Sequence, residues 1–365
     1  MILNLYLIRK YLTYFAIVSL GIVIMMLLID FLEHIRRFSG NSPSTGELMR
    51  LTILNLFGSF YQLLPLVALL ASIWTFIALS RSSEMTIARA SGRSAIRTLI
   101  PIIGSVFLLG TIAVAILNPI VAATQKEYEL SVSRINGADV GAIAISDGEI
   151  WLRQGDQGTQ SVISAERSNL DGTQLFNVTF FKFSDSGELL SRVHSQQATL
   201  VQNKWQLAKY KTWTFPTDPQ SQMNLSQGVV GEIETTLTAQ HISNSFGVPS
   251  SISIWNLPQF IQGLNDSGFS ARRHLVWFHL ELALPAFLAA ITVLAASLNL
   301  DHWRLQRTGV MVLTTVIMGF GLYFLRSFGQ VLAENGQISA ILGAWVPPAF
   351  AFLLALGYLL HKEEG

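Results

Sequence analysis

The chain has 365 residues, of which 50% are hydrophobic and only 13% are charged, and its formal net charge is +1. Soluble globular proteins carry about 25% charged residues, so this composition excludes a disordered chain and argues against an ordinary soluble enzyme. The near-neutral charge gives no basic field for nucleic acid, and a chain without cysteine has neither disulfides nor cysteine-ligated metal. We therefore expect an integral membrane protein.

Six long runs of the chain are strongly apolar and contain no Asp, Glu, Lys or Arg. A helix needs roughly 20 apolar residues to cross a hydrocarbon core about 30 Å thick, and the runs are long enough to do so. The first is expected to be a retained helix rather than a signal peptide, because no small-residue cleavage site follows it. We predict transmembrane helices at residues 11–29, 51–80, 98–125, 282–300, 308–325 and 335–361.

Charged side chains gather directly after the first run. Charges near the end of a membrane helix commonly reach the interface and have no further role. Arginine pairs also bind phosphate well, and Arg36 and Arg37 fall on the outer side, where positive charge is unusual. The residues alone leave both interpretations open for Asp30, Glu33, His34, Arg36 and Arg37.

Residues 81–92, after the second run, have the pattern of a short helix. Ser82 can cap its first turn, and Gly92 suits the position after its last turn. A face of small residues with one acid is suited to a partner's groove, whereas the alternative is a solvated connector with ordinary cytoplasmic arginines. The residues that share this face by their helical spacing are Glu84, Ile87, Ala88 and Ser91.

Residues 126–270 are polar and rich in turn signals. Alternating apolar and polar residues at 176–180, 205–208 and 211–215 predict half-buried strands. Many short strands at this spacing indicate an antiparallel sandwich or jelly roll, and we expect no helix in this region. The uncharged stretch 235–265 is too rich in Ser, Thr, Asn and Gln to span a membrane.

The Lys and Arg residues of the short loops predict the orientation. With the N-terminus in the cytoplasm, the inner segments hold nine of these residues and the outer short loops hold four. Because short cytoplasmic loops carry the excess of positive charge, we expect both termini in the cytoplasm and the 126–270 domain outside. That domain has nine Lys and Arg residues against 14 Asp and Glu, so it is mildly acidic.

Further charges lie near the outer ends of later runs. His279, Glu281 and Arg326 fall at a depth similar to that of Asp30. Since isolated charges at this depth are costly, we hypothesise that some of them pair across a central cavity. The alternative is four separate interfacial side chains.

Motifs of catalysis and of metal binding are missing from the sequence. It contains no G-x-x-x-x-G-K-[ST] loop for ATP, no H-E-x-x-H pair and no G-x-S-x-G elbow. The spacing of His274 and His279 is not that of a usual zinc pair. We expect neither a catalytic site, nor a metal site, nor a cofactor in this chain.

Four segments together resemble the LptF/LptG permease family, the membrane subunits of the transporter that extracts lipopolysaccharide from the inner membrane. They are Leu64–Ala71, Arg81–Gly92, Leu282–Pro285 and Val346–Pro348, and Arg81–Gly92 is the most specific. The resemblance covers nearly the whole chain. Residues 29–37 look more like LptG than LptF.

The resemblance implies an α-helical membrane protein of six transmembrane helices with an all-β, jelly-roll-like periplasmic domain inserted between helices 3 and 4. Residues 1–125 would hold helices 1–3 with a cytoplasmic coupling helix at 81–92. Residues 126–270 would form the periplasmic β domain, and residues 271–365 would hold helices 4–6. The location would be the bacterial inner membrane, with both termini in the cytoplasm.

By the same resemblance, the coupling helix docks on a cytoplasmic ATPase dimer, which binds the ATP and Mg. Glu84 would pair with a basic residue of that ATPase, and its neighbours would fix the geometry of the helix. The expected coupling residues are Arg81, Glu84, Ala88, Ala90, Ser91 and Gly92. Basic residues near the end of the first helix resemble those that LptG members present to the lipid, whose lipid A part carries phosphates. The expected lipid-binding residues are Asp30, His34, Arg36, Arg37, Glu281 and Arg326.

The expected function is therefore that of a non-catalytic permease subunit, which passes lipopolysaccharide from the outer leaflet of the inner membrane to a periplasmic β-domain bridge. Its partners would be the ATPase dimer, an LptF-like permease subunit, LptC-like and other periplasmic bridge proteins, and lipopolysaccharide, but no nucleic acid. The alternatives are the LptF-like paralogue and a membrane-anchored enzyme acting on envelope lipid. A mechanotransmitting permease usually has four spans, which argues against that class.

Overall fold

The structure is a computed structural model that divides into two compact units, which are described separately. One unit comprises Met1–Glu129, Ser250–Trp255 and Arg272–Gly365, and the other comprises Leu130–Pro249 and Asn256–Ala271. The residues that the structure describes are 2–40, 43–82, 84, 94–136, 143–146, 149–156, 159–169, 172–184, 187–215, 224–235, 248–299 and 308–364.

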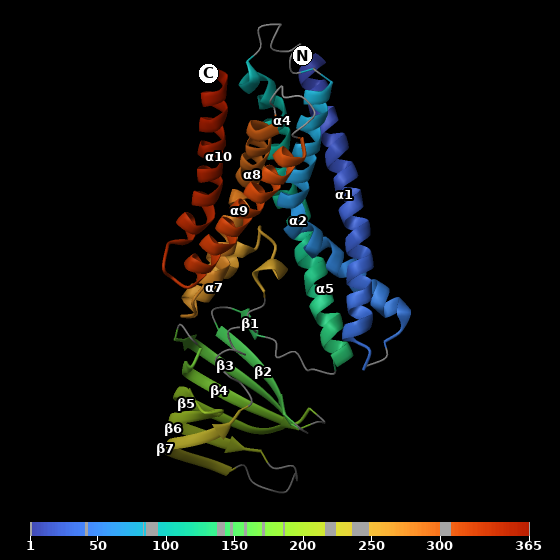
Figure 1. The fold of residues 1–365 in the computed structure, drawn as a ribbon. Coiled ribbons are helices and arrows are strands. Elements are labelled where there is room, and N and C mark those ends of the chain that lie inside the picture. Colours follow the sequence, from blue (N-terminus) through green and yellow to red (C-terminus); the bar gives the residue numbers. More distant parts are fainter. Residues whose placement is uncertain are drawn as a thin grey trace. The chain divides into compact units, whose positions relative to one another are not determined.

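The first unit is helical (Figure 1). Within the described residues, six stretches of helix are long and apolar enough to cross a membrane, as predicted: Ile2–Arg37, Thr45–Arg81, Ile96–Val132, Arg272–Asn299, Gly309–Glu334 and Ala340–His361. The elements of this unit are α1 (Ile2–Arg37), α2 (Thr45–Arg81), α4 (Ala95–Ile112), the π-helix η1 (Ala113–Leu117), α5 (Asn118–Asn136) up to Glu129, the 3₁₀ turn η2 (Pro249–Ser251) from Ser250, α8 (Arg272–Asn299), α9 (Thr308–Glu334) and α10 (Ala340–Glu364).

Both chain termini lie at one end of the helical unit, which we call the terminal end (Figure 1). The connections from α1 to α2 and from α9 to α10 lie at the other end, which we call the opposite end (Figure 1). At the terminal end, Ser82 caps the last turn of α2, and its hydroxyl donates to the Ala78 carbonyl over 2.9 Å. Apart from Arg81, Ser82 and Glu84, the predicted 81–92 helix lies outside the described residues, so its cap at Ser82 stays a prediction.

A π-helix interrupts the third span, which the sequence analysis did not predict. A π-helix inserts an extra residue into the turn and often marks a functional position. Here the Trp255 indole donates to the Ala115 carbonyl within η1 over 3.1 Å. The Asn118 side-chain oxygen, just after η1, accepts from the Ile254 backbone N–H over 2.8 Å. The stretch 250–255 is thus fastened to the third span.

The core of the helical unit is centred on α8, in which most side chains are buried. α1 is the reverse case: among its residues, only Leu7, Tyr11, Met26 and His34 are buried. Most of its large apolar side chains are exposed, as suits a helix that faces lipid or another membrane helix.

The second unit contains an antiparallel sheet, which confirms the prediction of a β domain. Its strands are β1 (Ile143–Ser146), β2 (Glu149–Asp156), β3 (Thr159–Ser168), β4 (Gln174–Ser184), β5 (Leu189–Val201), β6 (Lys204–Thr214) and β7 (Asn224–Glu234). Each pairs with the next in sequence, so the described strands follow the order of a meander, and the predicted jelly-roll-like arrangement stays a prediction. The stretches 205–208 and 211–215, predicted as two strands, fall within or at the end of one strand, β6.

A helix in this unit corrects the expectation that residues 126–270 contain none. α7 (Leu257–Asp266) places Leu257, Phe260, Ile261 and Leu264 on one face. Its apolar side chains pack on the core of the sheet, whose largest buried side chain is Trp205. These four residues recur at i, i+3, i+4 and i+7, so the amphipathic period of α7 was present in the sequence and was missed among its Gln, Asn and Gly residues.

Candidate functional site

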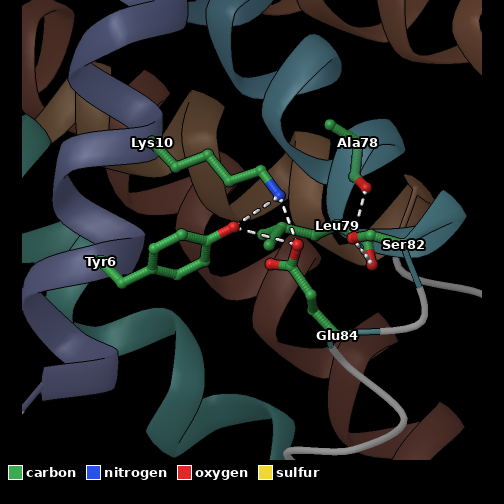
Figure 2. Close-up of polar contacts among 6 residues, drawn as sticks. All are labelled: Tyr6, Lys10, Ala78, Leu79, Ser82 and Glu84. Atoms are coloured by element: carbon green, nitrogen blue, oxygen red, sulfur yellow. Dashed lines mark hydrogen bonds and ion pairs between the residues drawn. The ribbon is translucent and has the colours of Figure 1, made fainter.

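A polar cluster at the terminal end joins α1 to the residues that follow α2 (Figure 2). The Lys10 ammonium donates to Glu84 Oε1 over 2.8 Å, and the Tyr6 hydroxyl donates to the same oxygen over 3.0 Å. The Lys10 nitrogen also lies 3.3 Å from the Tyr6 hydroxyl oxygen and 5.4 Å from the centre of the Tyr6 ring. We call Tyr6, Lys10 and Glu84 the Glu84 cluster.

The environment of this cluster keeps Glu84 charged. The Lys10 side chain is 15% exposed and the Glu84 side chain 28%, so the pair is partly shielded from water. Burial by itself raises the pKa of Glu84, but hydrogen bonds from Lys10, Ser82 and Tyr6, together with attraction to Lys10, outweigh it. The pKa of this carboxyl therefore lies below its usual value, and Glu84 is ionised at neutral pH.

Glu84 is one of the predicted coupling residues, whereas its partners Tyr6 and Lys10 were not predicted to contact it. Their spacing of four residues on one helix face is the signal that was available. Arg81, the last residue of α2, is exposed. The other expected coupling residues lie outside the described residues: Ala88, Ala90, Ser91 and Gly92.

At the opposite end, α1 finishes with two exposed arginines. Arg36 forms an ion pair with Glu33 over 2.9 Å, although its side chain remains 81% exposed. The guanidinium of Arg37 lies 5.5 Å from the centre of the Phe38 ring, and no described carboxylate lies within ion-pair distance of it. Both guanidinium groups can reach an external anion with little loss of internal contacts.

Asp30 and His34, on the last turns of α1, are held by neighbouring helices. The Asn55 amide donates to the Asp30 carboxylate over 2.9 Å. His34 is buried, and its ring nitrogens lie 3.1 Å from the Thr52 hydroxyl and 3.1 Å from the Tyr128 hydroxyl. These contacts join α1 to α2 and α5, and the sequence analysis did not predict the three partners.

Glu281 and Arg326 occupy a separate cluster in the interior of the helical unit. Glu281 is only 2% exposed and accepts a hydrogen bond from the Tyr61 hydroxyl. The Arg326 guanidinium lies 5.4 Å from the centre of the Phe287 ring and does not form an ion pair with Glu281. The pairing of these charges across a cavity therefore stays a prediction, and Asp30 accepts a hydrogen bond from Asn55 instead.

The chain matches the family described as lipopolysaccharide export system permease LptF/LptG over residues 5–362. Among similar proteins is the lipopolysaccharide export system permease protein LptG of Escherichia coli strain K12, 24% identical over 354 residues that cover 96% of this chain and 94% of the relative. The LptG of Haemophilus influenzae is 22% identical over 347 residues that cover 92% of each chain. This chain therefore belongs to the LptF/LptG family of lipopolysaccharide export permeases.

Proposed function

We propose that this chain is the LptG-type permease subunit of an ATP-driven lipopolysaccharide extractor in the bacterial inner membrane. The observation that carries the proposal is the arrangement of α1, which has an ionised carboxylate fixed beside one end and exposed arginines at the other. The carboxylate can bind a basic residue of a cytoplasmic ATPase. The two arginines, at the other end of the same helix, can bind a phosphorylated lipid. The relatives named LptG support this branch over LptF.

In the proposed mechanism, residues 81–92 dock on a cytoplasmic ATPase dimer, which binds ATP and Mg, so this chain needs no cofactor of its own. Glu84 pairs with a basic residue of the ATPase, and Arg81, Ala88, Ala90, Ser91 and Gly92 shape the docking segment. This chain and an LptF-like subunit enclose a cavity that collapses when the ATPase closes. Exposing acyl chains to water costs about 0.8 kcal/mol per CH₂, so the lipid needs a continuous apolar path.

The path leads to the β domain, which we place in the periplasm as a jelly-roll-like member of a bridge with LptC-like and other β-domain proteins. An unpaired strand edge is a suitable template for joining such domains. β1 and β7 are the end strands of the described sheet and therefore the candidate edges.

The proposed lipid contacts lie at the outer ends of the helices. Arg36 and Arg37 are the groups best suited to phosphate, because both are exposed and arginine binds phosphate in a bidentate manner. Asp30, His34, Glu281 and Arg326 complete the proposed site. Their internal hydrogen bonds and charge contacts support a role in shaping it.

Affinity purification in mild detergent tests the assembly. An ATPase dimer and a second six-span permease should co-purify with this chain, and Glu84→Arg should abolish ATPase recruitment. Glu127→Arg, at the opposite end of the helical unit, is the control that should leave recruitment intact. A stable lone subunit with hydrolytic activity on envelope lipid would instead favour the enzyme alternative.

Photo-crosslinking tests the lipid contact. A benzoylphenylalanine at Ile35 should crosslink to lipopolysaccharide in membranes, and the double change Arg36→Ala with Arg37→Ala should reduce the yield at least about tenfold, as expected for two lost charge-assisted contacts. Arg50→Ala is the matched control, since Arg50 already pairs with Glu127 over 3.4 Å. Equal yields from the double variant and the parent chain would contradict the assignment.

A further inference from the structure

The Glu84 cluster fastens Glu84, just after α2, to α1, a helix that otherwise packs mainly along α2 and α4. α1 has 36 residues, of which four are buried. Its remaining contacts with the unit include the stack of Tyr14 on Trp74, with ring centres 5.4 Å apart. Partly buried apolar side chains of α1, Leu3, Phe15 and Val18, also pack against the core, so the polar links add directional contacts to an apolar interface.

These polar links lie near the two ends of α1. At the terminal end, Lys10 and Tyr6 hold Glu84. At the opposite end, Asp30 binds Asn55 and His34 lies between α2 and α5. A continuous helix of 36 residues is about 54 Å long at 1.5 Å per residue. Such a helix transmits a displacement of one end to the other without bending sharply, because no proline interrupts it.

The chemistry of the terminal link makes it strong and specific. An ammonium group as shielded as that of Lys10 is costly to leave without a counterion. Partly buried pairs are screened by salt much less than exposed pairs. Tyr6 adds a second donor to the same carboxylate oxygen, which fixes the direction of the Glu84 side chain as well as its distance.

We propose that Tyr6 and Lys10 are positioning residues of the coupling site: they tie Glu84 to α1, so that displacement of residues 81–92 by the ATPase moves α1 and the two arginines at its far end. α1 then transmits motion from the ATPase-docking segment to the arginines that contact the lipid. This inference rests on the proposed function and adds the residues that convey the motion.

The first test separates coupling from docking in the complete complex, reconstituted into vesicles that contain lipopolysaccharide. With lipid release counted per ATP hydrolysed by the complexes that assemble, Tyr6→Phe combined with Lys10→Met should lower this ratio at least about fivefold, the lower end of typical coupling energies. Arg9→Met is the matched control, because Arg9 is an exposed cation directly before Lys10 on the same helix.

The second test measures the motion itself. The chain has no cysteine, so spin labels can be placed only where cysteines are introduced, here as Ile2→Cys and His361→Cys. Addition of ATP should change the distance between the labels in the parent complex and leave it unchanged when Lys10→Met is present. The exchanged pair Lys10→Glu with Glu84→Lys should restore the link of α1 in the resting state but recruit no ATPase.

Two results would overturn the inference. One is lipid release per ATP that is unchanged in the Tyr6→Phe and Lys10→Met double variant, with the label distance still responding to ATP. The other is loss of ATPase recruitment by Lys10→Met as complete as that caused by Glu84→Arg, which would make Lys10 a docking residue. If the unmodified chain recruits no ATPase, it is the proposed function that fails.

Discussion

Single buried polar residues hold the irregular parts of the helical unit in place. Asn118 is 2% exposed, and its side-chain oxygen is the acceptor for the buried Ile254 N–H. We predict that Asn118→Leu destabilises the unit by about 1–3 kcal/mol, the cost of leaving a buried donor without a partner. Thermal unfolding in lipid nanodiscs measures the loss. Asn335→Leu, at an exposed position, is the control, and equal melting of the two variants would contradict the prediction.

His194 gives the β domain a predictable dependence on pH. Partial burial, together with the charges of Arg192 and Lys211, holds its pKa below the usual value. When the pH falls below about 6.5, His194 of the unfolded chain binds a proton, whereas His194 of the folded domain remains neutral until a lower pH. The stability of the domain should therefore decrease from that pH down to the folded pKa of His194, and be independent of this residue above it.

A fluorine label on Val229→Cys, in a chain otherwise free of cysteine, can report the unfolding of this domain. His194→Gln keeps a neutral hydrogen-bonding side chain next to Thr179, whose hydroxyl lies 3.1 Å from the histidine ring. Between pH 7 and pH 5.5, the free energy of unfolding of the variant should fall less than that of the parent, because the variant has no histidine at this position to titrate. Identical pH profiles of the two proteins would refute the role of His194.

At this scale the sequence predicted which residues carry charge but not what each one touches. Glu84 stood out because an acid lies among small residues at helical spacing. Lys10 did not, because its contact with Glu84 joins positions 74 residues apart and depends on how α1 packs against the end of α2. Tyr61 was missed for the same reason, since a tyrosine in an apolar run resembles ordinary core until a buried carboxylate is found beside it.

At the scale of elements, close approach of α4 and α8 depends on one glycine. A Cβ atom added at Gly110 would lie 2.7 Å from the Cα of Pro285, and rotation of a side chain cannot relieve a clash with this backbone atom. We predict that Gly110→Ala forces the two helices apart and destabilises the helical unit by about 1–3 kcal/mol, as overpacking does. Gly104→Ala, on the same helix, has open space at that position and should be tolerated. Comparison of the two melting temperatures in nanodiscs decides the point, and equal destabilisation would show that helix propensity rather than packing matters.

The elements that the sequence predicted well are those whose signal is local and long. An apolar run of membrane length predicts a helix wherever it occurs, so all six spans were found. The ends of the helices extend further, as α1 does from Ile2 to Arg37, because capping and polar contacts continue a helix past its apolar part. η1 and α7 were not predicted: a π-helix depends on tertiary partners such as Trp255, whereas the amphipathic period of α7 was present but hidden in a stretch rich in Ser, Asn and Gln. The meander order of the strands is likewise set by pairing between distant residues.

For the whole molecule, the alternation of six helices determines which segments share a side of the membrane. Both termini, the end of α2 and the start of α4 belong to the terminal end, whereas the connections after α1 and α9 belong to the opposite end (Figure 1). The third span ends at the opposite end as well, since Arg50 near the start of α2 pairs with Glu127 of α5 over 3.4 Å. The third span therefore ends on the side opposite to the chain termini.

The positive charge of the short loops at the terminal end predicts that this end faces the cytoplasm. Single cysteines in the cysteine-free chain test the orientation with a membrane-impermeant maleimide on intact spheroplasts. We expect labelling before lysis at Ser39→Cys, Val229→Cys and Asn335→Cys, and labelling only after lysis at Ser94→Cys and His361→Cys. The parent chain, which has no thiol, is the control for background. The reverse pattern would place the Glu84 cluster in the periplasm, out of reach of any cytoplasmic ATPase, and would overturn the coupling proposal together with the orientation.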